Sequence, residues 1–76
     1  MFKLYTQEFC PRCDELKGFL KEQGIAYEEV DPTQDFTARA FMSLHDLEEL
    51  PVVRVGNEAL AGELEDMKAK IVSMLW

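Results

Sequence analysis

Two cysteines three residues apart, in the segment Cys10-Pro11-Arg12-Cys13, constrain this chain more than any other feature. The apolar and aromatic residues before them, over positions 2–6, alternate as they do in a strand. The residues after them recur at helical spacing, and Pro11 suits the first position of a helix because it has no N–H to leave unpaired there. The pattern therefore predicts a strand, a short connection, and a helix that begins at the cysteine pair.

This placement predicts redox chemistry. Side chains three positions apart on a helix are neighbours, with Cβ atoms about 5–6 Å apart, so a small backbone adjustment closes a disulfide. The free N–H groups and the dipole at a helix N-terminus favour a thiolate. We expect Cys10 to attack a disulfide and Cys13, one turn further in, to resolve the intermediate. Pro11 and Arg12 are expected to tune the pair and to contact substrate. A cation beside Cys10 stabilises its thiolate, whereas Glu8, Asp14 and Glu15 act in the opposite direction, so the net effect is left open.

The rest of the chain predicts an α/β domain that spans residues 1–76. A strand is expected over residues 25–30, and two more over residues 52–55 and 58–60, joined by a turn at Gly56-Asn57. Gly24 should close the first helix. A second helix should be capped by Asp31 or Thr33 and run to about Leu44. It should turn inward the apolar side chains Phe36, Ala40, Phe41 and Leu44.

A last amphipathic helix should run from Leu64 to the C-terminus, with Trp76 packing it onto the sheet. The order of elements predicts a parallel first strand pair and an antiparallel last pair. The expected architecture is a four-stranded mixed sheet flanked by three helices.

Charge and composition narrow the function. Asp and Glu number 15 against 8 Lys and Arg, a net charge of −7 at pH 7, which disfavours nucleic acid and anionic membranes as partners. The first residues lack the pattern of a signal peptide, and no apolar run reaches the roughly 18 residues of a membrane span. We therefore expect a cytoplasmic protein, in which a close cysteine pair is catalytic or metal-binding rather than a structural staple.

Metal binding is the alternative use of the pair. Structural zinc takes four ligands, and Cys10, Cys13 and His45 are the only cysteines and histidine. A dimer could supply two cysteines from each copy, so a zinc or iron–sulfur module stays open, although we expect no metal and a solvated His45. Two inert buried cysteines are a further alternative. The chain also contains Pro51 at the start of a predicted strand, which is compatible with a trans bond or with a cis bond that lets the preceding backbone pair with a substrate.

Four segments together resemble a known family. Tyr5-Thr6, Cys10-Pro11-Arg12-Cys13, Leu50-Pro51-Val52-Val53 and Ala61-Gly62 follow the order and spacing of the thioredoxin superfamily, in its glutaredoxin-like branch. Several of these segments are similar to the NrdH-type redoxins. The resemblance implies the thioredoxin fold, with a cis Pro51. It also implies that the backbone of Leu50 pairs with the substrate's cysteine, and that Gly62 leaves room for substrate beside the last helix.

The same resemblance implies a function. It implies a dithiol carrier that reduces protein disulfides through a redox-active Cys10–Cys13 disulfide and holds no bound cofactor. Its electrons would come from a disulfide reductase, either thioredoxin reductase-like or ferredoxin-linked, and its client would be a protein such as ribonucleotide reductase.

Glutathione could be the electron source instead, which would make the chain a glutathione-dependent glutaredoxin. Two family contacts to glutathione are altered here, however. Gln7 stands where glutaredoxins usually carry a lysine, and Glu49-Leu50 stands where they carry Thr-Val. A peptide-binding module without turnover is a third alternative.

Overall fold

Four short strands form the centre of the molecule, described by a computed structural model over residues 2–75. They are β1 (Phe2–Tyr5), β2 (Tyr27–Val30), β3 (Val52–Val55) and β4 (Glu58–Leu60). The sheet order is β2-β1-β3-β4, with β1 parallel to β2 and antiparallel to β3, and β3 antiparallel to β4. The predicted mixed sheet, with its parallel first pair and its terminal hairpin, is confirmed.

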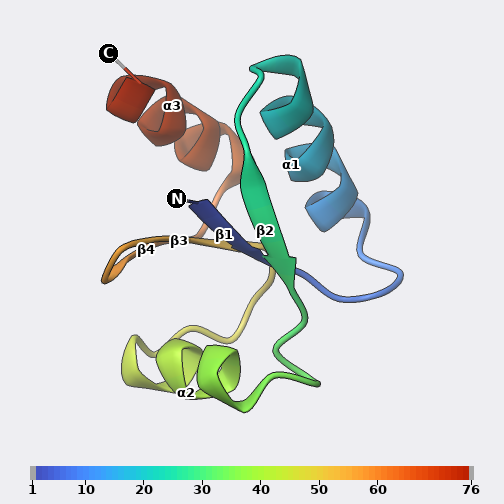
Figure 1. Cartoon of the computed structure of the whole chain (residues 1–76), viewed down its shortest axis with the longest axis vertical. Coiled ribbons are helices and arrows are strands. Elements are labelled where there is room, and N and C mark those ends of the chain that lie inside the picture. The colour runs from blue at the N-terminus through green and yellow to red at the C-terminus, as the bar shows by residue number, and fades with distance from the viewer. Residues whose placement is uncertain (1, 76) are drawn as a thin grey trace.

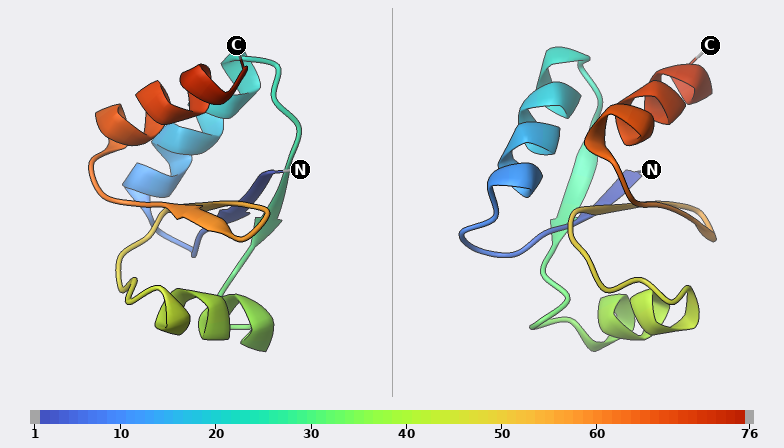
Figure 2. Two further views of the ribbon diagram at one scale, coloured as in Figure 1. Left: turned by 90° about the vertical axis from the view of Figure 1, so that its left-hand side faces the viewer. Right: turned by 180° about the vertical axis from the view of Figure 1, so that it is seen from behind.

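The three helices cover both faces of this sheet (Figures 1 and 2). Helices α1 (Pro11–Glu22) and α3 (Leu64–Leu75) lie together on one face, and α2 (Phe36–Leu44) lies on the other. Because successive strand residues point to opposite faces, Leu4 and Val53 join the core under α1 and α3, while Tyr5 and Val52 join the core under α2. The alternation that predicted the first strand thus divides the interior into two layers.

The ends of several elements differ from the expectation. Strand β2 begins at Tyr27 rather than at residue 25, and α2 is capped by the Asp35 side chain, which accepts a hydrogen bond from the Ala38 N–H. Asp31 instead accepts hydrogen bonds from the N–H and hydroxyl of Thr33, so these two residues form a turn before the helix. Gly24, with a φ of +68°, follows the last turn of α1 as predicted.

The inward face of α2 was partly mispredicted. Phe41 is buried, but Phe36 is 77% exposed and Leu44 is 83% exposed. The helix face that meets the sheet carries Ala38, Phe41 and Met42, and Ala40 is half-buried. None of the helices within residues 2–75 is long and apolar enough to cross a bilayer. Trp76 lies outside the described residues.

Candidate redox site

Cys10 is the N-cap residue of α1, and Pro11 occupies its first turn, as predicted. The backbone N–H of Cys13 donates a hydrogen bond to Cys10 Sγ at 3.2 Å. The two cysteines form a disulfide, with their Cα atoms 5.2 Å apart, and this spacing lies within the usual range for such bonds. Cys10 is half-buried, whereas Cys13 is fully buried. The same N–H donor and the helix N-terminus would stabilise a thiolate on Cys10 after reduction.

The sheet register brings Pro51 to the same edge as the cysteine pair. Val52 lies opposite Tyr5 on the antiparallel strands β3 and β1, so Pro51 comes where β1 ends and the connection to Cys10 begins. The Leu50–Pro51 peptide bond is cis, and Pro51 is buried. The cis conformation that the resemblance implies is therefore confirmed, and the half-buried Leu50 lies just outside it.

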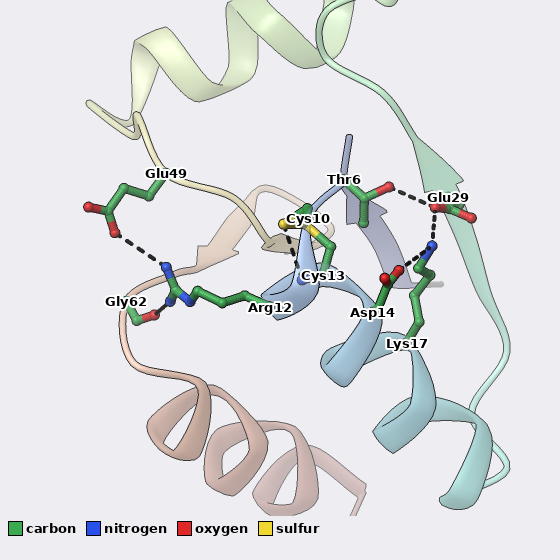
Figure 3. Close-up of a disulfide and its surroundings, with 9 residues drawn as sticks. All are labelled: Thr6, Cys10, Arg12, Cys13, Asp14, Lys17, Glu29, Glu49 and Gly62. Atoms are coloured by element: carbon green, nitrogen blue, oxygen red, sulfur yellow. Dashed lines mark hydrogen bonds and ion pairs between the residues drawn. A yellow bond between two sulfur atoms is a disulfide. The ribbon is translucent and has the colours of Figure 1, made fainter. Parts of the chain in front are cut away.

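Arg12 contacts two loops that are distant from it in the sequence. Its guanidinium extends away from the cysteine pair (Figure 3), donating a hydrogen bond to the carbonyl oxygen of Gly62 at 2.6 Å and lying 3.6 Å from the carboxylate of Glu49. The effect of Arg12 on the Cys10 thiolate stays a prediction. Arg12 joins the start of α1 to the loop before Pro51 and to the loop before α3.

Gly62 adopts a φ of +106°, which L residues rarely adopt, and a Cβ built there would meet no atom within 4 Å. Backbone conformation, rather than crowding within the chain, therefore requires glycine at this position. The role of Gly62 in leaving room for a substrate stays a prediction.

A polar network lies beside Thr6, where the connection from β1 to Cys10 begins (Figure 3). The buried Thr6 hydroxyl donates to Glu29 at 2.7 Å, and Lys17 bonds the same carboxylate at 2.9 Å and lies 3.4 Å from Asp14. The hydrogen bond from Lys17, followed by that from Thr6, lowers the pKa of Glu29. The hydrogen bond to Glu29 in turn raises the pKa of Lys17. Sequence reasoning missed this network, since its members come from three separate elements.

Phe9 was also missed. It is the residue before Cys10, and its side chain is 98% exposed at a φ of +57°. The signal was present in the sequence as one aromatic residue in an otherwise polar connection, Gln7-Glu8-Phe9.

His45 is the C-cap residue of α2 and is exposed, as expected, with its ring tilted against that of Phe41 at 4.3 Å between centroids. Over residues 2–75, His, Cys, Asp and Glu side chains do not gather in groups of three or more that could hold a metal ion.

A disulfide at the start of a helix, opposite a cis-proline on a four-stranded mixed sheet, defines a thiol–disulfide redox domain with the thioredoxin fold. The comparisons give the same class. A family model described as glutaredoxin matches residues 2–60. The chain belongs to the glutaredoxin family, whose members in general are thiol–disulfide oxidoreductases.

Solved structures show which members it is similar to. The thioredoxin-like protein BC3987 is 35% identical, with a TM-score of 0.76 over 91% of this chain and 97% of that one. Glutaredoxin from Brucella melitensis is 25% identical, with a TM-score of 0.71 over 97% of this chain and 86% of that one. The glutaredoxin-like NrdH-redoxin from Escherichia coli shares the fold at 20% identity, with a TM-score of 0.75 over 90% of this chain and 91% of that one. A comparison with curated protein sequences gives no match.

Proposed function

We propose that this chain reduces protein disulfides as a dithiol carrier, with Cys10 as the nucleophile and Cys13 as the resolving thiol. The observation that carries the proposal is the asymmetry of the pair. Cys10 is the more exposed sulfur and accepts an N–H bond at the helix N-terminus, whereas Cys13 is fully buried one turn further in.

The reaction proceeds by two exchanges. The Cys10 thiolate attacks one sulfur of the client disulfide, forms a mixed disulfide, and displaces the other client sulfur as a thiolate that takes up a proton. Cys13 then loses its proton, attacks Cys10 Sγ, and releases the second client thiolate. The client gains two electrons and two protons, and the chain is left with the Cys10–Cys13 disulfide. We expect the backbone of Leu50, which precedes Pro51, to pair with the client segment around its cysteine.

The charges around the pair favour a reductase over glutathione as electron donor. Glutathione carries two carboxylates, which need cations. Arg12 is already engaged by Gly62 and Glu49. Arg39 lines a groove of about 380 Å³ together with Gln7 and Leu50, but its guanidinium already donates to the carbonyl oxygens of Pro32 and Thr33. The nearby groove of about 270 Å³ is lined by Asp46, Leu47, Glu48, Glu49, Ala61 and Gly62, three of them acids and none a cation. We therefore propose a thioredoxin reductase-like or ferredoxin-linked donor, with a cytoplasmic client such as ribonucleotide reductase.

The test is reduction of insulin with two donor systems in parallel. One contains glutathione, glutathione reductase and NADPH, and the other a thioredoxin reductase with NADPH. Turnover with the reductase alone supports the proposal, whereas turnover with glutathione alone identifies a glutathione-dependent glutaredoxin. Cys10→Ser should abolish activity, and Cys13→Ser should accumulate a mixed disulfide through Cys10. No reduction with either donor or with dithiothreitol, together with stoichiometric zinc or iron in the purified protein, would favour the metal-binding alternative.

A further inference from the structure

The side chain of Phe9 is almost fully solvated, with 98% of its surface exposed, immediately before the nucleophile. Its φ of +57° lies in the left-handed region, where bulky L residues are genuine outliers. A phenylalanine here therefore raises the free energy of the folded chain twice, by its backbone conformation and by its exposed ring. Within residues 2–75 no packing offsets either cost, which points to a partner outside the chain.

The chemistry of Cys10 places a client beside this ring. During exchange the client's cysteine is covalently joined to Cys10 Sγ, and consecutive Cα atoms are only 3.8 Å apart. The residues on either side of the client cysteine therefore lie next to the Phe9–Cys10 segment in the mixed disulfide.

The surroundings of Phe9 say which client side chain it fits. The connection that carries it is otherwise polar, and the groove beside it is lined by Thr6, Gln7, Glu8, Asp14, Lys17, Glu29 and Asp31. The ring has no apolar neighbour in this groove. A second copy of the chain is a poor partner for it, because each copy carries a net charge of −7 and the groove already holds carboxylates. A client with an apolar side chain next to its cysteine would bury the ring and remove both apolar surfaces from water.

We propose that Phe9 is a specificity-determining residue that selects protein disulfides in which an apolar side chain adjoins the attacked cysteine. The inference rests on the proposed function, since it needs Cys10 to react with clients. It also distinguishes such clients from glutathione, whose glutamyl and glycyl residues offer no apolar side chain to the ring.

A double-mutant cycle tests the inference without any electron donor. The reduced chain is freed of reductant and mixed with an excess of a symmetric peptide disulfide, and the rate of Cys10–Cys13 oxidation is followed by acid quench and mass spectrometry. Two peptides are compared, identical except for Leu or Ser beside the cysteine. Because both halves of each disulfide are the same, attack on either sulfur is equivalent, and the leaving thiol does not change between the peptides.

The native chain should react roughly fivefold faster with the leucine peptide, as expected for partial burial of a phenylalanine and a leucine side chain. Phe9→Asn, which tolerates the left-handed conformation, should reduce this preference to less than about twofold while leaving the rate with the serine peptide nearly unchanged. Phe9→Leu should keep most of the preference. Phe36→Asn removes the exposed phenylalanine at the start of α2 and serves as the matched control, with the full preference retained.

Three outcomes would overturn the inference. The native chain could show no preference, Phe9→Asn could keep it, or Phe9→Asn could slow both peptides equally, which would assign Phe9 to the reactivity of Cys10. If the native chain oxidised with neither peptide, the proposed function itself would fail, and with it this inference. If only the inference fails, the native chain still becomes oxidised by both peptides.

Discussion

Replacing Arg12 by methionine should loosen the two loops that flank the redox pair. The substitution keeps a long apolar stem and removes every donor, so the Gly62 carbonyl and the Glu49 carboxylate both lose their partner. Hydrogen bonds to charged groups contribute about 1.5–3 kcal/mol. The Arg12 side chain is 42% exposed, and solvent screening lowers the expected contribution of the Gly62 bond to about 1 kcal/mol.

The ion pair contributes less. Glu49 is 81% exposed, and exposed pairs of this kind contribute about 0.3 kcal/mol. Arg12→Met should therefore lower the free energy of unfolding by about 1.3 kcal/mol, close to a tenfold change in an equilibrium constant. Glu49→Gln should lower it by about 0.3 kcal/mol, because the bond to Gly62 remains.

Urea denaturation of the oxidised chain measures both values, and hydrogen exchange over residues 61–63 reports the loop itself. Lys21→Met makes the same change of charge in the last turn of α1, about 15 Å from the pair by the helical rise, and serves as the control. A loss in Glu49→Gln equal to that in Arg12→Met would refute the assignment of the larger share to Gly62.

The pH dependence of Cys10 alkylation separates positioning from charge. If Arg12 acted on the thiolate, Arg12→Met would shift that profile to higher pH, whereas Lys21→Met would not. An unchanged profile in both variants is expected here, since the guanidinium is turned to the loops.

Three further changes test other parts of the structure. Glu29→Gln should lower stability at pH 7, because the pKa of Glu29 is lowered by Lys17 and Thr6. The stabilisation from its ionised form is present above the ordinary value of 4.5 and is lost as pH falls through the lowered pKa. Thermal unfolding between pH 3 and 7 should thus vary less in this variant than in the native chain. Gly62→Ala should lower the free energy of unfolding by about 1 kcal/mol or more through backbone strain. Gly18 lies at an exposed position in the middle of α1, and Gly18→Ala should raise the free energy of unfolding by about 0.5–1 kcal/mol. Equal effects of the two substitutions would contradict the argument from the positive φ of Gly62. Leu16→Ala should cost about 3 kcal/mol because the side chain is fully buried, and Leu44→Ala, at an exposed position, should stay within about 0.5 kcal/mol of the native chain.

The local sequence pattern predicted the helices and strands and their order, because the signal for each of them comes from residues that are neighbours in the chain. Pro11 after Cys10 marked the start of α1, and Gly24 marked its end. The alternation of β1 predicted a strand whose Leu4 and Tyr5 face opposite cores. The start of α2 was harder, since Asp31, Thr33 and Asp35 can all cap a helix. The structure has Asp35 as the cap, and the packing of α2 on the sheet leaves Phe36 and Leu44 exposed.

The candidate site also contains parts that the sequence pattern predicted and parts that it did not. The positions of Cys10 and Cys13 follow from their spacing and from the helix that they open, so the sequence was sufficient to find them. The cis conformation at Pro51 came only from the resemblance, since spacing alone left both isomers open.

The partners of Arg12 could not be predicted by either route. The Gly62 carbonyl lies 50 positions away in the chain. It is a backbone group, so no residue type in the sequence predicts that it accepts this bond. The sequence shows an arginine between two cysteines, from which the nearest consequence is a charge effect on their reactivity. The fold brings two loops within reach of the same guanidinium, and a hydrogen bond at 2.6 Å then competes with any contact to sulfur. We therefore expect Arg12→Met to lower the free energy of unfolding and to leave the pH profile of Cys10 alkylation unchanged.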